Sequence, residues 1–435
     1  MVQKITKVIE KLKAKIRNEK ENKEKYVKTA SGFTRERKLP LEAVVIFLTF
    51  MVKKTLSVEL DKYFEIKGTN SCNKSAMSQR RKLLDYKIFI DLNDSLCDNV
   101  YKTIKCNRWN GRKVIAVDGT KVNTINKKEV VMEFGVQKTL GKDVPMAQVI
   151  SSYDVLAKMC IKSEITMLNR SEGSVAMKMV ESYSRDMIVL YDRGFPSSGL
   201  MHHHIVNNIP FVMRVKKDFN REVVKFVKKK SKEAIVEIKL SMIGKKSLKE
   251  IGYKIEDDMK IRVRLIRVEL GEDFTILVTS LKNRKYYNRK KFKELYNMRW
   301  GIETYFDKMK NKMKVETFSG RTVENIKQEF HALVLASNIH SLIVQATEHE
   351  MHQSNNKREH KYDLKINQNV TLGIFKNRVV ELLTSDDIKS VILLMIESFL
   401  RYKIPIISER KNVRKKRQYV IRGKHKTVLN YGEAI

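Results

Sequence analysis

Residues 296–310 read YNMRWGIETYFDKMK, and this stretch decides how the rest of the chain is interpreted. It contains no proline and a single glycine, so it predicts one long helix. Four polar residues at relative positions 0, 3, 7 and 14 share a sector of roughly 60° on that helix: Tyr296, Arg299, Glu303 and Lys310. A carboxylate between two cations suits a metal ligand beside a phosphate clamp. Surface pairing of Arg299 with Glu303 at i and i+4 explains the same charges and stays open.

Two further acidic residues each follow a short apolar run. KVIAVD ends at Asp118 and MIVLYD ends at Asp192. Both runs predict buried strands, with the acid at the carboxyl end just where the chain turns. Sites gather at such ends in sheets with helical crossovers. A role in turn formation or helix capping explains either aspartate taken alone, since Asp before Gly is a common turn signal.

The texture of the sequence predicts three regions. Residues 1–110 show helical spacing of apolar residues and form an expected N-terminal DNA-binding region. Residues 111–345 mix strands, among them Val130–Phe134, with helices, which predicts an α/β or α+β core. Within it, residues 210–285 read as strands with short connections and predict a separate antiparallel sheet inserted into the core. Residues 346–435 are helical and basic.

The charge balance predicts a polyanionic partner. Lys and Arg number 88 against 50 Asp and Glu, a formal net charge of +38. Nucleic acid is the commonest partner of such a chain, because phosphate contacts release condensed counterions. A Lys-rich proteome explains many lysines but not the scarcity of carboxylates. The helix predicted within Ser71–Leu84 carries Arg80 and Arg81 and suits a major groove, although a solvated basic face is equally open. Arg410–Arg417, RKNVRKKR, predicts a basic tail that meets DNA.

Cysteine usage and hydropathy predict a cytoplasmic protein. The four cysteines form no C-x-x-C pair and show no zinc-binding spacing with histidine, so free thiols in a reducing compartment are expected. The longest apolar run, Ala43–Val52, has about half of the ~20 residues that a membrane span needs and predicts a buried helix. The N-terminus lacks the apolar region of a signal peptide. We therefore expect no membrane contact and association with the nucleoid when DNA is bound.

The helix motif resembles that of a known family, the insertion-sequence-four transposases, which are relatives of the transposon-five transposase. Their signature, Y-x2-R-x3-E-x6-K, matches residues 296–310 at every position. VIAVDGTKVN and VLYDRGF resemble the family's first and second aspartate segments, and FGVQKTLGKDVPMAQVISSYDVL resembles the strand-rich stretch between them. FTRERKLPLEAVVIFL and SAMSQRRKLL look like its DNA-binding region. The resemblance thus covers nearly the whole chain.

This resemblance implies an α/β fold with an RNase H-like catalytic core, a mixed sheet with flanking helices, interrupted by a β-rich insertion. It implies that Asp118, Asp192 and Glu303 form a metal-binding triad for Mg²⁺, with Mn²⁺ as a substitute. The implied activity is cut-and-paste transposition: cleavage at terminal inverted repeats and strand transfer to target DNA through a hairpin intermediate. The implied partners are double-stranded DNA and a second copy of the chain on the paired ends.

The resemblance also assigns DNA contacts. Arg299 and Lys310 would hold phosphates near a base that is flipped out of the duplex, and Tyr296 would contact the adjacent backbone. Arg193, directly after Asp192, is a further candidate DNA contact.

The sequence departs from the family in its tryptophans. Family members can stack the flipped base on a Trp in the insertion, but this chain has only Trp109 and Trp300, neither of them there. Either an aromatic residue such as Phe274 or Tyr253 substitutes, or the flipped base is held less tightly. Trp300 is either a stacking residue on DNA or a core residue, and we favour the core. Asp307, one turn after Glu303, is an alternative metal ligand.

Two other functions stay open from the sequence. The chain could be a DNA end-binding protein that has lost catalysis, although its intact acidic residues argue against this. It could also be a plain metal-dependent nuclease that does not join strands.

Overall fold

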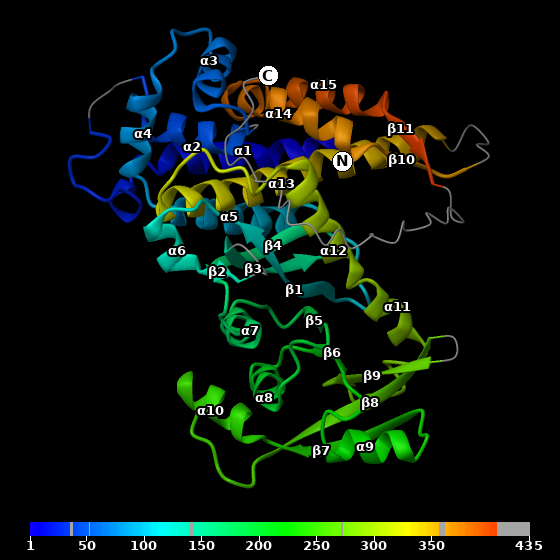
Figure 1. Cartoon of the computed structure of the whole chain (residues 1–435). Helices are drawn as coiled ribbons and strands as arrows, with labels where there is room; N and C mark the ends of the chain where they lie inside the picture. Colours follow the sequence, from blue (N-terminus) through cyan, green and yellow to red (C-terminus); the bar gives the residue numbers. More distant parts are fainter. Residues whose placement is uncertain (35–37, 52, 139–142, 271–272, 356–361, 407–435) are drawn as a thin grey trace, which may run out of the picture. The chain divides into compact units, whose positions relative to one another are not determined.

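The computed structural model describes residues 1–34, 38–51, 53–138, 143–270, 273–355 and 362–406 (Figure 1). The chain forms two units that are each discontinuous in sequence. Unit 1 combines Met1–Lys105, Val122–Ala147 and Asp307–Ile435. Unit 2 combines Cys106–Lys121 and Gln148–Phe306. The predicted basic tail, Arg410–Arg417, lies outside the described residues.

Unit 2 is built on a mixed sheet, as the α/β prediction requires (Figure 1). Its strand order is β3-β1-β5-β6-β9-β8-β7, and β4 also pairs with β3. β1 and β5 are parallel, as are β5 and β6, whereas β6, β9, β8 and β7 pair in antiparallel fashion. The strands are β1 (Lys113–Asn123), β3 (Val144–Asp154), β4 (Met159–Met167), β5 (Met187–Tyr191), β6 (Phe211–Val215), β7 (Glu233–Lys239), β8 (Lys260–Leu270) and β9 (Asp273–Thr279). β1 ends and β3 begins in unit 1.

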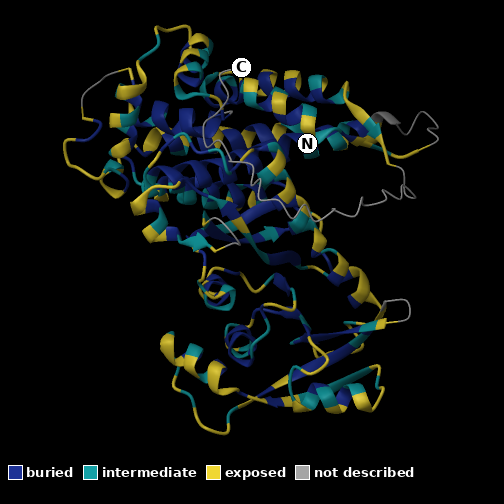
Figure 2. Ribbon diagram, in the orientation of Figure 1, coloured by how far each residue is buried: buried dark blue, intermediate teal, exposed yellow. Residues whose placement is uncertain are grey.

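Helices flank this sheet because parallel neighbours need crossover connections. The α8 helix joins the parallel strands β5 and β6. The α11 helix packs on the sheet through Phe292 and Leu295, which belong to one buried cluster with Val114, Ile188 and Leu190. Figure 2 colours the strands largely as buried, whereas α9 and α10 carry exposed residues. The helices are α7 (Glu172–Val180), α8 (Ser198–Val206), α9 (Arg221–Lys228), α10 (Met242–Glu250), α11 (Lys291–Asn297) and α12 (Trp300–Asp307).

The expected separate sheet at residues 210–285 is not formed. The strands predicted there exist, but they extend the same sheet, because β6 pairs with β5 and β9 pairs with β6. β5 is buried along its whole length, so the backbone groups on its outer edge need partners, and β6 supplies them. The inserted residues thus continue the core sheet.

Val130–Phe134 is a second correction, because it forms the helix α6 (Lys128–Phe134) instead of a strand. Val130 and Phe134 are both buried. They are four residues apart, which places them on one helix face. A run this short is ambiguous between the two periodicities, and burial of that face favours the helix.

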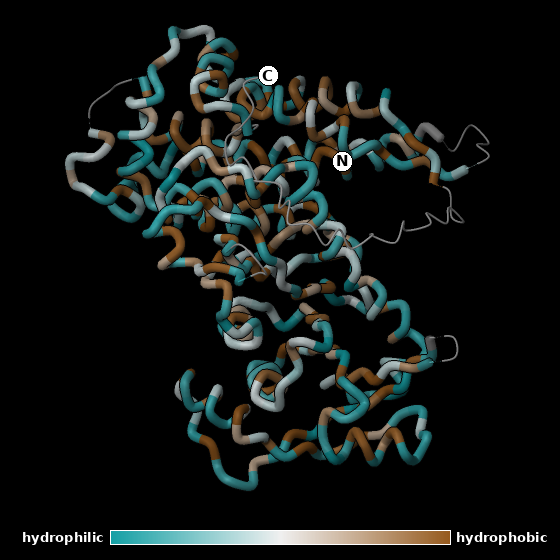
Figure 3. The backbone as a smooth tube through the Cα atoms, viewed as in Figure 1, coloured by the Kyte–Doolittle hydropathy of each residue, from teal (hydrophilic) through white to brown (hydrophobic). Residues whose placement is uncertain are grey.

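Unit 1 is mainly helical, as predicted for the two ends of the chain. Its central element is α13, 33 residues long, which contacts α2, α5 and α15. Hydrophobic and hydrophilic segments alternate along the surrounding helices (Figure 3). Among the described helices, none combines the length and hydropathy that crossing a bilayer requires. The helices are α1 (Val2–Asn18), η1 (Lys23–Lys25), α2 (Leu41–Phe50), α3 (Leu56–Ile66), α4 (Lys74–Lys82), α5 (Lys87–Thr103), α6, the π-helix η2 (Lys308–Lys312), α13 (Val323–Asn355), α14 (Gln368–Thr384) and α15 (Ile388–Leu400). Short strands complete it: β2 (Val136–Gln137), which pairs with the start of β3, β10 (Leu364–Ile366) and β11 (Lys403–Pro405).

Candidate catalytic site

Strand register brings the two aspartates together in unit 2. The last registered pair of the parallel strands β1 and β5 is Val117 with Tyr191. Asp118 and Asp192 are the next residues, so they lie side by side at the same end of the two strands, with their Cα atoms about 5 Å apart. The predicted turn follows Asp192, whose carbonyl accepts the Phe195 N–H at 3.1 Å. The predicted turn after Asp118 is wrong, because β1 keeps β3 as a partner and runs on to Asn123.

The signature segment is not the single helix that the sequence predicts. The α11 helix ends at Asn297, residues 298–299 form a turn, and α12 begins at Trp300. Hydrogen bonds across this break join residues three apart, such as Gly301 N–H to Met298 O at 2.9 Å. A Cβ on Gly301 would lie 3.1 Å from Cγ1 of Val155. Glycine both weakens the helix and permits this close approach.

Arg299 joins two of the predicted catalytic acids. Its Nη1 lies 3.4 Å from Oδ2 of Asp118, and its Nη2 lies 2.8 Å from Oε1 of Glu303. The Arg299 side chain is only 4% exposed. A buried guanidinium therefore links Asp118 on the sheet to Glu303 on α12.

Asp192 is held by two other residues. The Tyr296 hydroxyl donates to Oδ1 of Asp192 at 3.1 Å, and Nη1 of Arg214 lies 3.9 Å from the same oxygen. Nε of Arg214 donates to Oγ1 of Thr275 at 3.1 Å, which fixes the guanidinium. Our sequence reasoning did not identify Arg214. The available signal was a single arginine in the otherwise apolar strand FVMRV.

Burial and crowding of negative charge shift the protonation of this site. Burial raises the pKa of Asp118 to about 6, and the charges of Glu303 and Asp192 act in the same direction. The Gly119 N–H, which donates to Oδ1 of Asp118 at 2.8 Å, and the Arg299 charge oppose the rise. Burial also raises the pKa of the Tyr296 hydroxyl, and the Asp192 charge adds to it.

The donor chemistry of the site fits a hard divalent cation, since three carboxylates offer oxygen ligands. The arrangement of these carboxylates does not match a metal site. Across the described ranges, no group of three or more His, Cys, Asp or Glu side chains is placed to hold a metal ion. In its place, Asp118 and Glu303 both contact the Arg299 guanidinium. The residue types therefore suit a metal ion, and their present geometry is that of an ion-pair cluster.

Comparison with known proteins shows the family of the chain. Residues 109–339, more than half of the chain, match the family described as "Transposase DDE domain". The chain belongs to this family. The matched range contains all three predicted catalytic acids together with Tyr296, Arg299 and Lys310.

One curated relative and one solved structure extend the comparison. The transposase InsG for insertion sequence element IS4 from Escherichia coli (strain K12) is 21% identical over 243 residues, 53% of this chain and 52% of that protein. The chain thus spans about half the length of this curated relative, and the predicted resemblance to the insertion-sequence-four transposases is confirmed. A cryo-EM structure of the piggyBac transposase synaptic complex with hairpin DNA is similar with a TM-score of 0.43 and 12% identity, over 94% of this chain and 84% of that chain.

Trp300 of this DDE-family chain is a surface residue, so the expectation that it is a core residue is wrong. Its side chain is 57% exposed. The break between α11 and α12 explains this, because it starts a new helix at Trp300. Cζ of Arg299 lies 5.1 Å from the centre of the indole ring, within cation–π range.

A cationic cavity of about 700 Å³ lies beside Asp192 in unit 2. Five cations line it, against two acids, Asp218 and Asp273; the cations are Arg193, Arg214, Lys216, Lys217 and Lys228, and Phe274 lies among them. Phe274 is flanked by Nζ of Lys217 at 4.1 Å and Cζ of Arg267 at 3.7 Å from its ring centre. The other candidate aromatic, Tyr253, instead hydrogen-bonds His203 at 2.9 Å through its hydroxyl. Of the two candidate aromatics, Phe274 is thus the one in contact with cations, each of which also pairs with an acid, Lys217 with Asp273 and Arg267 with Glu269.

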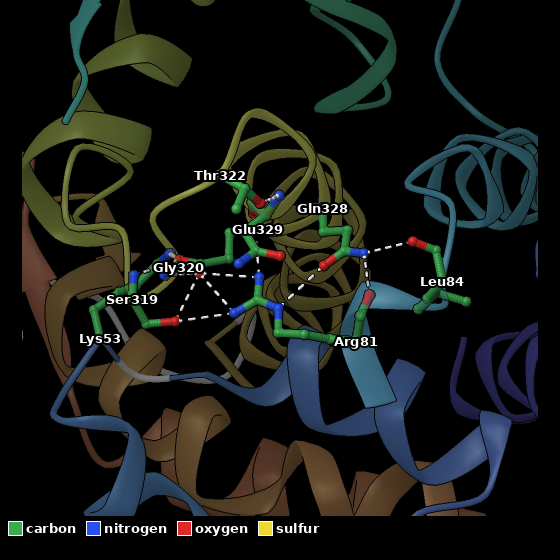
Figure 4. Close-up of polar contacts among 9 residues, drawn as sticks. Lys53, Arg81, Leu84, Ser319, Gly320, Thr322, Gln328 and Glu329 are labelled. Atoms are coloured by element: carbon green, nitrogen blue, oxygen red, sulfur yellow. Dashed lines mark hydrogen bonds and ion pairs between the residues drawn. The ribbon is translucent and has the colours of Figure 1, made fainter. Parts of the chain in front are cut away.

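Arg81, in unit 1, is buried in an ion pair, which argues against its predicted contact with DNA. Figure 4 shows its guanidinium directed at Glu329 and Gln328 of α13. Nη1 and Nη2 lie 3.1 and 3.2 Å from Oε1 of Glu329, and Arg81 is 1% exposed. Residue 81 lies on the inner face of α4, where a cation needs a buried acid.

Three other residues with predicted roles at the site are Arg80, Lys310 and Asp307. Arg80 is half-buried, and its Nε donates to Leu39 O at 2.9 Å, so its contact with DNA stays a prediction. Lys310 lies in the π-helix η2 of unit 1, so it does not share with Tyr296 the one regular helix that the sequence predicted. Asp307 accepts a hydrogen bond from Asn311 at 2.6 Å.

Proposed function

We propose that the chain is a DNA transposase that cuts an insertion sequence from its terminal inverted repeats and joins it to target DNA. Asp118, Asp192 and Glu303 are the proposed catalytic residues. The observation that carries this proposal is the position of Asp118 and Asp192 directly after the last registered pair of β1 and β5, with Arg299 linking Asp118 to Glu303. Membership in the DDE transposase family supports it. An RNase H-like core and domain boundaries near residues 110 and 345 are part of the same proposal.

In this proposal Asp118, Asp192 and Glu303 hold divalent metal, Mg²⁺ with Mn²⁺ as a substitute. When bound, such ions activate the attacking hydroxyl and stabilise the leaving 3′ oxygen of a phosphodiester. The remaining groups orient the acids. The Gly119 N–H directs Oδ1 of Asp118, and the Tyr296 hydroxyl directs Oδ1 of Asp192. The contact of Tyr296 with DNA stays a prediction, because its ring is buried.

The proposed DNA contacts are cations and aromatic rings near the acids. Arg193 and Arg214 line the cationic cavity beside Asp192, where a phosphate would neutralise them. Phe274 offers a ring on which an unpaired base can stack, as the predicted hairpin intermediate requires. Trp300 offers a second, exposed ring. Lys310 retains its proposed phosphate contact, and a homodimer on paired DNA ends is also proposed.

The test is to mix the purified chain with duplex DNA carrying the terminal inverted repeat and with Mg²⁺. We expect cleavage and then joining to a target duplex. We expect Asp118→Ala, Asp192→Ala and Glu303→Ala each to lose cleavage while end binding stays within about twofold. Asp307→Ala separates the alternatives at the third ligand, and we expect it to cleave normally.

Each other outcome contradicts a stated part of the proposal. Binding of the repeat without cleavage by the unaltered chain would identify an inactive end-binding protein. Cleavage without joining would identify a nuclease. Normal cleavage by a variant of one of the three acids would remove that residue from the triad.

A further inference from the structure

Arg299 occupies the place between two catalytic acids where a divalent ion would need to be. Its two terminal nitrogens contact Asp118 and Glu303 at 3.4 and 2.8 Å, and the side chain is almost fully enclosed. No set of three acids in the described chain is free to hold a metal ion in this arrangement. The chain therefore carries its own counter-ion in the site.

The Arg299 guanidinium is only partly satisfied there. Its Nε is buried and has no hydrogen-bond partner among the described residues. An unpaired buried donor is costly, and most such groups in folded proteins have a partner. A position that leaves one of three guanidinium nitrogens without a partner is suited to a side chain that later binds another anion.

The surroundings of Arg299 allow its side chain to move away from the two acids. It lies in the two-residue turn between α11 and α12, where its N–H donates to Tyr296 O at 3.1 Å and its carbonyl accepts from the Ile302 N–H at 3.2 Å, so the guanidinium leaves by side-chain rotation alone. The ring of Trp300, 5.1 Å from Cζ of Arg299, is exposed on the surface. A guanidinium that turns toward this ring stays in cation–π contact while it approaches solvent and any bound DNA.

We propose that Arg299 is a resident counter-ion which divalent metal and a DNA phosphate displace together. The metal ion takes over Asp118 and Glu303, and the released guanidinium binds the phosphate. This inference rests on the proposed function, in which the three acids hold metal. Charge explains the coupling: the guanidinium and a divalent ion repel each other strongly at contact distance, and Arg299 needs a new anion once it leaves the acids.

Reciprocity follows from this exchange. If DNA holds Arg299 away from the acids, then DNA must tighten metal binding, and metal must tighten DNA binding by the same factor. A chain without the Arg299 charge lacks the competition and should bind metal tightly even without DNA.

The experiment measures Mn²⁺ affinity of the full-length chain by electron paramagnetic resonance, with and without an already cleaved terminal-repeat duplex. For the unaltered chain we expect DNA to tighten Mn²⁺ binding by about tenfold, within the usual range of coupling. We expect Arg299→Gln to bind Mn²⁺ about tenfold tighter without DNA and to lose most of the DNA effect. Arg108→Gln is the matched control, because it removes a cation of unit 2 that pairs with Asp186, outside the proposed metal site. It should keep the DNA effect.

The results that overturn the inference are distinct from those that overturn the function. If Arg299→Gln binds Mn²⁺ no tighter than the unaltered chain, or still responds to DNA to the same extent, Arg299 is not the counter-ion. If Asp118→Asn and Glu303→Gln bind Mn²⁺ normally, the proposed metal site itself is wrong. Should Arg299→Gln fail to fold in a melting experiment, Arg299→Lys replaces it. Lysine keeps the charge but cannot bridge both acids, so we expect a smaller gain in affinity, and no gain would overturn the inference.

Discussion

Replacement of Glu329 by glutamine tests the buried charge network of unit 1 (Figure 4). The Glu329 carboxylate is fully buried and accepts from Nζ of Lys53 at 2.8 Å and from both terminal nitrogens of Arg81 at 3.1 and 3.2 Å. It also accepts from the Ser319 N–H and hydroxyl at 3.0 and 2.7 Å and from the Gly320 N–H at 2.9 Å. Glu329→Gln keeps the shape and removes the charge, so two buried cations lose their only anion in this network.

Two independent routes give the size of the effect. Breaking a buried ion pair by removing one partner costs about 3–5 kcal/mol. Burial acts to raise the pKa of Glu329, but the charges of Lys53 and Arg81 outweigh it and lower the pKa from 4.5 to about 2. At 1.36 kcal/mol per unit, this difference corresponds to about 3 kcal/mol of stability. Since the folded pKa is the lower one, this stability is present above pH 4.5 and is lost as the pH falls toward 2.

The assay is urea-induced unfolding at pH 7, followed by circular dichroism. Glu397→Gln is the matched control, because Glu397 pairs with Arg401 on the surface and is 63% exposed. Exposed pairs contribute about 0.2–1 kcal/mol. We expect Glu329→Gln to lose about 3 kcal/mol at pH 7 and much less at pH 3, where part of the original stability is already gone. Equal losses in the two glutamine variants would refute the reasoning.

Three more predictions concern single residues. The pKa of Asp118 is raised from 3.8 to about 6, so ionised Asp118 destabilises the fold as the pH rises through that window. After allowance for solvent screening, Asp118→Asn should raise the stability of the metal-free chain by about 1–2 kcal/mol at pH 8. Below pH 4 the variant should bring no gain, and thermal melting at both pH values checks this. Trp300→Ala should weaken binding to terminal-repeat DNA by about 1–3 kcal/mol without changing the melting temperature. Trp109 is a buried ring stacked on Tyr287, so Trp109→Ala should instead lower the melting temperature. The reverse pattern in gel-shift and melting experiments would contradict both assignments. Arg81→Met should lower the urea midpoint while the folded fraction binds DNA as the unaltered chain does, so a selective loss of DNA affinity would restore Arg81 to the DNA interface.

Local periodicity predicted much of the fold. The apolar spacing through Ile5, Val8, Ile9 and Leu12 anticipated α1, whose inner face is buried at all four positions. Runs of β-branched residues anticipated β1 and β5. Val130–Phe134 failed because a short apolar run fits both periods, and only burial against the rest of unit 1 selects the helix.

The errors in the site have non-local causes. The break near Arg299 depends on the contact of Gly301 with Val155, which lies far away in sequence. Arg81 looked like a surface cation because its partner, Glu329, is 248 positions further along. Arg214 was missed because only the order of strands puts β6 beside β5. Strand ends and helix spacing made Asp118, Asp192 and Glu303 candidates but left turn, capping and surface-pairing roles open, and only the resemblance to a family predicted a triad.

The spacing of the signature follows from the sheet that it crosses. Parallel strands lie about 4.8 Å apart, and three residues of helix advance about 4.5 Å. Tyr296 and Arg299 are three residues apart, and they contact Asp192, which directly follows β5, and Asp118 on β1, the neighbouring strand. A helical segment that passes over two strand ends can therefore bring one side chain to each aspartate when the two side chains are three residues apart. Glu303 lies four residues after Arg299, so the i,i+4 spacing of a helical turn brings its carboxylate back to the same guanidinium.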